Sequence, residues 1–493
     1  MILKFIILCM TIIKFKPNDK KKFFSLCCLC AISTLIAQKN LTLPSLVSDN
    51  MVLQQSSSVN LWGWAEKNQN IDITASWTSS MISVRSNAEG KWEAEIRTPT
   101  AGGPYTILIK SKKASIKLKN IMVGEVWLAS GQSNMQMPLK GYASEPINGN
   151  NELILNSRNP KIRMFTVKRN SSPHPVDDCM GSWQEAKPEN TPNFSSVAYV
   201  FAQKINRILD VPVGIIHSSW GGTPVEAWTQ KDAMDIALTP QEKSTFRYNK
   251  DLNKREQDAP SQLFNGMIHP LLNYNIKGVI WYQGESNRNH PMVYQKTFPL
   301  MIQNWRQLWD NKKMPFYYVQ IAPYGRYSGE VNSALLRETQ LKTMDLLDQV
   351  GMAVTLDVGE HQSIHPAEKI KVGERLSYWA LAKDYNVKGI RFSGPIYKSH
   401  EVNGNKILVS FDHASMGLST YGAPLNDFEI AGEDRVFHEA KAKILRSGKI
   451  EAYSEKVSTP VALRYGWKNF LTGSLFNTYG LPASSFRTDN WED

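Results

Sequence analysis

The stretch Val126-Trp-Leu-Ala-Ser-Gly-Gln-Ser-Asn-Met135 gives the first indication of the fold. Its first four residues are apolar and typical of a buried strand, and the run then breaks into small polar residues. A strand that ends in such a turn presents the hydroxyl of Ser133 at the carboxyl edge of a sheet. Open α/β sheets bind their ligands at that edge, and a nucleophilic serine needs an exposed turn. The stretch predicts a nucleophile at Ser133, although a Gly-x-Ser triplet by itself is more often a plain polar turn.

The segment from residue 121 to 394 alternates between apolar strands and amphipathic helices. Short apolar runs predict buried strands at Val123–Ala129, Val213–His217, Gly278–Tyr282, Phe316–Ile321 and Met352–Leu356. Helices are expected at Phe194–Leu209, Tyr294–Trp309, Leu335–Leu347 and Lys369–Ala382. Continuous apolar strands that alternate with helices are typical of a mostly parallel sheet covered on both faces. We therefore predict an α/β domain over 121–394.

Polar clusters follow directly after four of these predicted strands. The clusters are Gly131–Asn134, Ser218–Thr223, Gln283–Asn287 and Asp357–His365. Because the carboxyl ends of parallel strands meet at one edge of a sheet, we expect all four clusters to lie close together. Their coincidence at one edge is a stronger indication of a site than any single motif.

Both flanks of the α/β domain have the pattern of β modules. Residues 40–120 alternate apolar and polar side chains in short runs, separated by Gly, Asn, Pro and Ser. Residues 395–493 return to the same pattern. Short strands at this spacing predict small sandwich-like modules. The N-terminal module could bind carbohydrate, but a packing or spacer role is the more ordinary interpretation.

The first 37 residues have the pattern of a leader. Lys20-Lys-Lys22 precedes the apolar run Phe23–Ala37, as in a secretory signal peptide, and that run is shorter than the roughly 20 residues of a membrane span. The leader contains Cys9, Cys27, Cys28 and Cys30. Only Cys179 lies beyond it, so no internal disulfide is expected. We predict an exported protein, periplasmic or secreted, with no stable membrane span after processing; a lipoprotein anchor is the less favoured alternative.

The positive charge of the chain is spread thinly. Residues 1–37 carry six lysines and one aspartate, so they account for +5 of the total formal charge of +12. The remaining +7 forms no dense basic run and is typical of a solvated surface. We therefore expect no nucleic-acid partner.

A serine hydrolase needs a nucleophile, a base, a group that orients the base, and donors for the oxyanion. Ser133 is the candidate nucleophile and His365, on a loop fixed by Pro366, the candidate base. Asp357 is the candidate orienting acid, and Glu360 lies on the same loop. A Ser–His dyad that uses a backbone carbonyl in place of an acid is the third possibility.

Backbone and side-chain amides near Ser133 are the candidate oxyanion donors. The backbone N–H groups are those of Ser133 and of Gly221 or Gly222, since glycine allows close approach to a ligand. The side-chain amides are those of Gln283, Asn287 and Asn134. Gly222, Gln283 and Asn287 are the preferred set.

Two rival interpretations of these residues remain. Ser286 also stands in a Gly-x-Ser triplet, and neither serine completes the Gly-x-Ser-x-Gly elbow of the α/β-hydrolases. His361 and His365 are four residues apart, a spacing that suits zinc on a helix. Pro366 and the preceding strand argue against a helix there, so no metal site is expected.

Seven motifs together resemble the sialate O-acetylesterases, carbohydrate esterases of the SGNH (GDSL-like) hydrolase superfamily. They are Ser48-Asp-Asn-Met-Val-Leu-Gln54, Gly124-Glu-Val-Trp-Leu-Ala-Ser-Gly-Gln-Ser-Asn-Met135, Ser219-Trp-Gly-Gly-Thr-Pro-Val-Glu-Ala-Trp228, Leu263-Phe-Asn-Gly-Met-Ile-His-Pro270, Trp281-Tyr-Gln-Gly-Glu-Ser-Asn287, Ile364-His-Pro366 and Arg464-Tyr-Gly-Trp467. The resemblance runs from about Leu43 to Trp491.

The resemblance implies a flavodoxin-like three-layer core with Ser133 as nucleophile and His365 as base. It implies an O-acetylated carbohydrate as substrate, and no metal or other cofactor. Many members of the superfamily place Asp three residues before the histidine, and many sialate-type relatives two before it. Gln362 and Ser363 stand at those positions here, so the resemblance does not assign the orienting acid, and Asp357 is the candidate from the loop itself.

Sialic acid is the preferred sugar, and its carboxylate needs a cation, for which Arg326 and Arg337 are candidates. One alternative is an esterase of acetylxylan or another plant polysaccharide, which needs an open aromatic groove. A second alternative is a glycan-binding protein that retains the hydrolase fold without catalysis.

Overall fold

The computed structural model describes residues 41–246, 255–329 and 331–491. The predicted leader, 1–37, lies outside these ranges. Within them, no helix combines the length and apolar character of a membrane-spanning segment.

The centre of the molecule is a sheet whose middle strands run parallel. Its strands, in spatial order, are β13 (Val350–Ala353), β12 (Phe316–Val319), β11 (Gly278–Tyr282), β7 (Ser115–Gly131), β10 (Val213–Ser219), β8 (Asn159–Thr166) and β9 (Trp183–Ala186). All neighbours are parallel except β8 and β9. The five strands from β10 to β13 follow the order 2-1-3-4-5, which is that of flavodoxin-like sheets. This confirms the predicted α/β fold with a parallel sheet.

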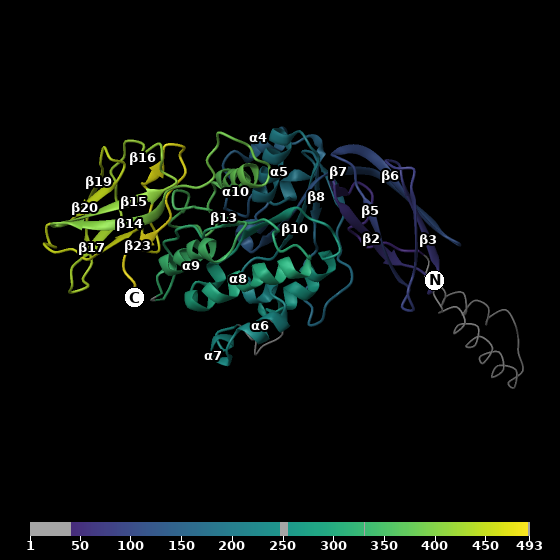
Figure 1. The fold of residues 1–493 in the computed structure, drawn as a ribbon, viewed down its shortest axis with the longest axis horizontal. Coiled ribbons are helices and arrows are strands. Elements are labelled where there is room, and N and C mark those ends of the chain that lie inside the picture. Colours follow the sequence, from purple (N-terminus) through teal and green to yellow (C-terminus); the bar gives the residue numbers. More distant parts are fainter. Residues whose placement is uncertain (1–40, 247–254, 330, 492–493) are drawn as a thin grey trace, which may run out of the picture.

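Helices cover both faces of this sheet (Figure 1). One face carries α5 (Ser196–Leu209) and α10 (Lys369–Lys383), and the other carries α8 (Pro291–Leu308) and α9 (Ser333–Leu346). The apolar run in β7 serves both faces because side chains alternate along a strand. Trp127 and Ala129 are buried in the core under α5 and α10. Val126 and Leu128 are buried in the core under α8.

Strand β7 also joins the α/β domain to the N-terminal β module. The module contains β1 (Val52–Gln54), β2 (Ser58–Trp64), β3 (Asn70–Ala75), β4 (Met81–Arg85), β5 (Lys91–Arg97) and β6 (Gly102–Ser111). Strands β1 and β6 pair with the first part of β7, and β10 and β11 pair with its last part. The boundary expected between residues 120 and 121 therefore falls inside one unbroken strand. Strand β5 shows the expected alternation, with Trp92, Ala94 and Ile96 buried between exposed neighbours.

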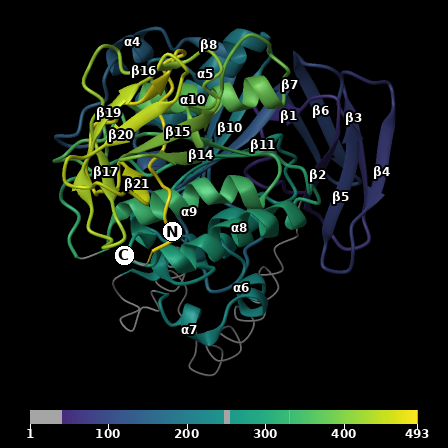
Figure 2. The same cartoon turned by 60° about the vertical axis from the view of Figure 1, so that its left-hand side comes forward.

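The C-terminal module consists of small antiparallel sheets (Figure 2). Its strands are β14 (Ile396–Asn403), β15 (Lys406–Asp412), β16 (Leu418–Ser419), β17 (Phe428–Ala431), β18 (His438–Glu439), β19 (Lys441–Ile444), β20 (Ile450–Tyr453), β21 (Ala462–Tyr465), β22 (Phe476–Asn477) and β23 (Phe486–Arg487).

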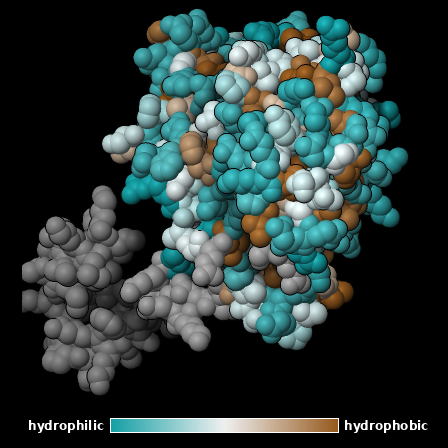
Figure 3. Space-filling model, turned by 90° about the vertical axis from the view of Figure 1, so that its left-hand side faces the viewer, coloured by the Kyte–Doolittle hydropathy of each residue, from teal (hydrophilic) through white to brown (hydrophobic). Residues whose placement is uncertain are grey.

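Apolar residues on the face of the molecule seen in Figure 3 are scattered among hydrophilic ones.

Arg337 of α9 ties the C-terminal module to the α/β domain. Its fully buried guanidinium donates hydrogen bonds to the hydroxyls of Ser333 and Ser485 and to the carbonyl oxygens of Gly466 and Lys468. Burial lowers the pKa of Arg337 to about 10. The expectation that Arg337 binds a substrate carboxylate is wrong, because its donors are used inside the fold and solvent does not reach it.

Replacing Arg337 with methionine is expected to lower the free energy of unfolding by about 3 kcal/mol, since buried carbonyl and hydroxyl oxygens lose their donor. Urea denaturation of the two proteins measures this difference. Arg326→Met is the matched control, because that side chain is exposed, and it should leave the urea midpoint unchanged. Equal midpoints for Arg337→Met and the unmodified chain would contradict the assignment.

Candidate active site

Ser133 lies at the carboxyl end of β7 and begins the short helix α3 (Ser133–Gln136). The preceding turn needs Gly131, which has φ 136°, and a Cβ there would lie 2.2 Å from the carbonyl oxygen of Tyr282. The glycine lets β7 turn directly against β11. The Ser133 side chain is consequently half-buried at the edge where the strands end.

His365 lies on the loop after β13 and is held by a carboxylate. Its Nδ1 is 2.8 Å from Oε2 of Glu145, and the two side chains are 17% and 28% exposed. The ring of Tyr142 packs edge-on against the His365 ring, with centres 5.3 Å apart. The Tyr142 hydroxyl donates to the carbonyl oxygen of Ser133 at 3.2 Å. Tyr142 therefore contacts both Ser133 and His365, and the same histidine is bonded to Glu145.

Asn134 makes a second connection between the serine turn and the histidine loop. Its Nδ2 donates to the carbonyl oxygen of Ile364 at 3.0 Å and to Oε1 of Glu285 at 2.6 Å. Its Oδ1 accepts a hydrogen bond from Nζ of Lys369 at 2.6 Å. Burial raises the pKa of Glu285 and lowers the pKa of Lys369 to about 7. The residue after Ser133 is thus bonded to the residue before His365.

Asn134→Ala is expected to lower kcat/KM by about 10²-fold, because a shift of roughly 1 Å between reacting groups costs that much. The loss follows from releasing the Ile364 carbonyl and leaving the Glu285 carboxyl without its donor. Initial rates of acetate release, the activity that the sequence resemblance implies, measure it. Asn148→Ala removes an exposed amide that bonds to Glu368, and it should keep full activity. Equal rates for both variants would contradict a positioning role for Asn134.

The expectation that Asp357 lies beside His365 is not met. Both Asp357 carboxylate oxygens accept hydrogen bonds from the guanidinium of Arg375 on α10, each at 2.7 Å. The pair is largely buried, with side chains 10% and 7% exposed. Glu360 is engaged as well, since its Oε1 accepts a hydrogen bond from the backbone N–H of Ala367. Proximity along the chain misled the prediction, because the loop turns these carboxylates toward α10 and toward its own backbone.

Glu145 has no counterpart among the residues expected from the sequence. It lies 220 residues before His365 in the chain, in the loop between α3 and α4 (Asn150–Leu155). Tyr142 and Glu145 close a tight turn there through two backbone hydrogen bonds. Ser363 donates to the other Glu145 oxygen at 3.4 Å. Ser363, which stands two positions before His365 where many relatives have an aspartate, therefore contacts the carboxylate of Glu145.

The predicted oxyanion donors divide into backbone and side-chain groups. Among the described residues, the backbone N–H groups of Ser133 and Gly222 have no hydrogen-bond acceptor, whereas that of Gly221 donates to Gln136 at 2.8 Å. Gln283 is fully buried and donates to the Thr223 carbonyl and to Oδ1 of Asn287.

Asn287 also serves the segment that follows the glycines. Its Nδ2 donates to Glu226 at 2.8 Å, and its Oδ1 accepts from the backbone N–H of Val225 at 2.9 Å. With Gln283, it fixes the Thr223–Glu226 segment. The Gln283 amide donates one proton to the Thr223 carbonyl and the other to Oδ1 of Asn287. No proton is left for an oxyanion, so the expected role does not fit Gln283. Gly222 and Ser133 fit it through their backbone N–H groups.

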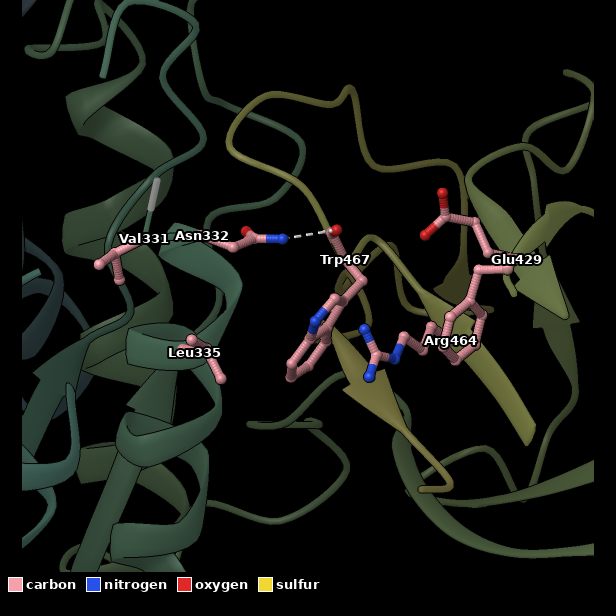
Figure 4. A pocket seen from close by; sticks show the side chains of 7 residues that line it. Val331, Asn332, Leu335, Glu429, Arg464 and Trp467 are labelled. Atoms are coloured by element: carbon pink, nitrogen blue, oxygen red, sulfur yellow. Dashed lines mark hydrogen bonds between the residues drawn. The ribbon is translucent and has the colours of Figure 1, made fainter. Parts of the chain in front are cut away.

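Two pockets with tryptophan side chains in their lining lie away from this edge. One of about 370 Å³ separates α9 from the C-terminal module and is lined by Val331, Asn332, Leu335, Glu429, Phe437, Arg464 and Trp467 (Figure 4). The guanidinium groups of Arg464 and Arg487 lie over the Trp467 ring, 5.3 and 4.9 Å from its centre. Because Trp467 is only 5% exposed, its ring offers no open face to a sugar. Within the described ranges, no three His, Cys, Asp or Glu side chains are grouped to hold a metal ion.

Comparison with known proteins identifies the family of the chain. The family described as "carbohydrate esterase, sialic acid-specific acetylesterase" matches residues 123–381, a span that contains both Ser133 and His365. The chain belongs to this family. It is therefore a carboxylic ester hydrolase of the carbohydrate acetylesterase class.

Members of the family resemble the chain over most of its length. Sialate O-acetylesterases of Pongo abelii and Homo sapiens are each 28% identical to it, over 86% and 75% of this chain and 87% and 76% of their own lengths. A carbohydrate acetylesterase from Xanthomonas citri is 34% identical, with a TM-score of 0.83, over 92% of this chain and 100% of that structure. The similarity covers the α/β domain together with both flanking regions.

Proposed function

We propose that this acetylesterase removes O-acetyl groups from sialic acid by acyl transfer through Ser133, with His365 as the base and Glu145 as the acid that orients it. The observation that carries the proposal is the gathering of Ser133, His365 and Glu145 around Tyr142. The 2-1-3-4-5 strand order supports the further proposal of an SGNH hydrolase domain over 121–394, between sandwich-like modules at 40–120 and 395–493.

In the first step, Nε2 of His365 takes the proton of the Ser133 hydroxyl as its oxygen attacks the acetyl carbonyl. The carbonyl oxygen becomes an oxyanion that accepts hydrogen bonds from the backbone N–H groups of Ser133 and Gly222. The imidazolium returns its proton to the sugar oxygen, and the carbon–oxygen bond to the sugar breaks. Glu145 holds Nδ1–H of His365, so that Nε2 faces the serine and the imidazolium is stabilised.

In the second step, His365 takes a proton from water, and the hydroxide oxygen attacks the acetyl group on Ser133. The same two backbone donors hold the second oxyanion. Acetate leaves and the proton returns to the serine oxygen, which restores the enzyme. Each preorganised oxyanion donor contributes about 3–4 kcal/mol to lowering the barrier.

The sialic acid substrate is supported by the family description and by the names of the mammalian relatives. A second candidate is the acetyl ester of a neutral polysaccharide such as xylan. The relative from Xanthomonas citri favours it, because that protein is described as a carbohydrate acetylesterase, without mention of sialic acid, and is more nearly identical to this chain.

Acetate release from 9-O-acetyl sialic acid and from acetylated xylo-oligosaccharide decides between these substrates. The proposal expects a higher kcat/KM for the sialic acid ester. A higher value for the xylo-oligosaccharide would reassign the protein to the second candidate. If neither these sugars nor an aryl acetate releases acetate, the chain is a glycan-binding protein on a hydrolase fold.

We also propose that the leader directs export to the periplasm or the medium, with the lipoprotein anchor as the alternative. The basic and apolar pattern of residues 20–37 supports export. Mass determination of the protein purified from each cell fraction tests it. Recovery of the uncleaved chain in the cytoplasm would contradict export.

A further inference from the structure

An exposed guanidinium that has no carboxylate partner among the described residues lies beside the serine turn. Arg169 follows β8, and its Cζ is 5.4 Å from the centre of the Trp220 ring. Trp220 directly follows β10, is half-buried, and bonds through its backbone N–H to the Gly131 carbonyl. At the next residue, Gly221, a Cβ would lie 3.2 Å from Cβ of Ser133. The indole that supports Arg169 is therefore one residue from direct contact with the nucleophile.

The charge of Arg169 reaches the groups that surround the site. Burial raises the pKa of the Tyr142 hydroxyl to about 12, and the positive charge of Arg169 opposes that rise. Burial, together with the charge of Arg169, also lowers the pKa of His217, on β10, to about 4. Tyr142 contacts both His365 and Ser133. Arg169 is therefore near enough for its charge to act on the tyrosine that contacts both Ser133 and His365.

Other arginines near this edge are occupied. Arg255 pairs with Asp258, Arg375 pairs with Asp357, and the guanidinium of Arg288 donates to the carbonyl oxygens of Ser328 and Val331. Within the described ranges, Arg169 has neither an ion pair nor a hydrogen bond, only its contact with Trp220. Arg326 is also exposed, but it lies on the loop after β12, whose Gly325 contacts His361.

The chemistry of the pair suits one class of ligand. A planar guanidinium binds a carboxylate through two parallel hydrogen bonds, and such charge-assisted bonds are among the stronger ones in proteins. A half-buried indole offers an apolar face on which the carbon–hydrogen face of a sugar ring can pack. A ligand that uses both groups is a sugar ring that carries a carboxylate.

We propose that Arg169 and Trp220 form a subsite for an acidic sugar ring, and that Arg169 determines the preference of the enzyme for acidic over neutral acetylated sugars. The inference rests on the proposed esterase function of Ser133. Sialic acids and hexuronic acids share the required carboxylate. They differ in its position, which is on the anomeric carbon in the first and on the terminal carbon in the second.

The test compares kcat/KM of the unmodified enzyme and Arg169→Ala on five substrates. These are 9-O-acetyl sialic acid, its carboxamide analogue, acetylated galacturonic acid, acetylated xylo-oligosaccharide and an aryl acetate. On the preferred acidic sugar, Arg169→Ala is expected to lose about 10- to 100-fold in kcat/KM through a higher KM, as removal of one charge-assisted contact implies. The carboxamide, the xylo-oligosaccharide and the aryl acetate should be cleaved equally by both proteins.

Two further variants sharpen the result. Arg169→Lys keeps the charge without the planar fork, so it should recover part of the lost specificity. Arg326→Ala should leave the acidic-to-neutral ratio unchanged, and a change in that ratio would move the subsite to the β12–α9 loop.

A uniform loss on all substrates would overturn the proposal, because it would indicate a structural role for Arg169. An unchanged acidic-to-neutral ratio in Arg169→Ala would overturn it as well. Failure of the underlying esterase function is distinguishable, since the unmodified enzyme would then fail to cleave even the aryl acetate. The acidic sugar that shows the larger loss identifies the source of the carboxylate.

Discussion

Ser133→Ala is expected to reduce acetate release by roughly 10⁴- to 10⁶-fold, the loss seen when a serine hydrolase loses its nucleophile. The residual rate would come from the oxyanion donors and from substrate binding, which the substitution leaves in place. Because Ser133 is half-buried at a strand end and its side chain supports no part of the core, the fold should be retained. Initial rates on an aryl acetate and on an acetylated sugar, with circular dichroism of both proteins, measure the effect.

Ser286→Ala is the matched control for that experiment. Ser286 stands in the other Gly-x-Ser triplet and lies in the short helical turn Glu285–Asn287, after β11. The Tyr142 hydroxyl donates a hydrogen bond to the Ser133 carbonyl oxygen, and the Tyr142 ring contacts His365. Through Tyr142, His365 is therefore linked to Ser133. Ser286→Ala is expected to retain most of the activity. Loss of turnover in Ser286→Ala with retention in Ser133→Ala would reverse the two assignments.

Glu145→Gln is expected to lower kcat by as much as about 10⁴-fold, with little change in KM. A glutamine amide can present its N–H to Nδ1 of His365. The ring then carries its proton on Nε2, where it cannot accept the serine proton. The loss therefore falls on the chemical step, and steady-state kinetics at several substrate concentrations separate it from a binding defect.

Asp357→Asn provides the contrast to Glu145→Gln. Asp357 forms a largely buried ion pair with Arg375, and breaking such a pair typically costs 3–5 kcal/mol of stability. This variant should unfold at lower urea concentration and keep kcat at low temperature. Loss of kcat in Asp357→Asn at unchanged stability would restore Asp357 as the orienting acid. Full activity in both variants would indicate a Ser–His dyad.

The regular elements of the α/β domain were predictable because each carries a local signal. The run Gly278–Tyr282 is buried on every side and forms β11 with those bounds. The helix expected at Lys369–Ala382 begins at the predicted residue and extends by one residue, to Lys383. Parallel strands place their carboxyl ends at one edge, so the meeting of the polar clusters followed from the topology alone.

The partners of individual side chains were not predictable in the same way. Glu145 and His365 are brought together by a turn at Tyr142–Glu145 and by the packing of two loops. Neither the turn nor the loop packing has a recognisable signal in the sequence. Gln283 follows a strand at the correct edge, yet its amide turns toward Thr223 and Asn287. Position along a strand determines where a residue lies, whereas rotamer and neighbouring loops determine which atom it contacts.

The division into modules met a similar limit. The change of pattern near residue 121 marks a real change in neighbours along β7, from antiparallel β6 to parallel β10 and β11. The backbone itself continues without a break from Ser115 to Gly131. Periodicity reports which faces of a strand are buried, and it cannot distinguish the end of a strand from a change of partners.

The most direct test of the nucleophile is to label it covalently with a reagent that reacts only with an activated serine. The protein would be treated with a fluorophosphonate, which labels activated serines, and the labelled peptide would be identified by mass spectrometry. We expect one adduct, on Ser133, which is reduced in Glu145→Gln and abolished when His365 is replaced by alanine. An adduct on Ser286, or labelling of Ser133 at an equal rate without His365, would contradict it.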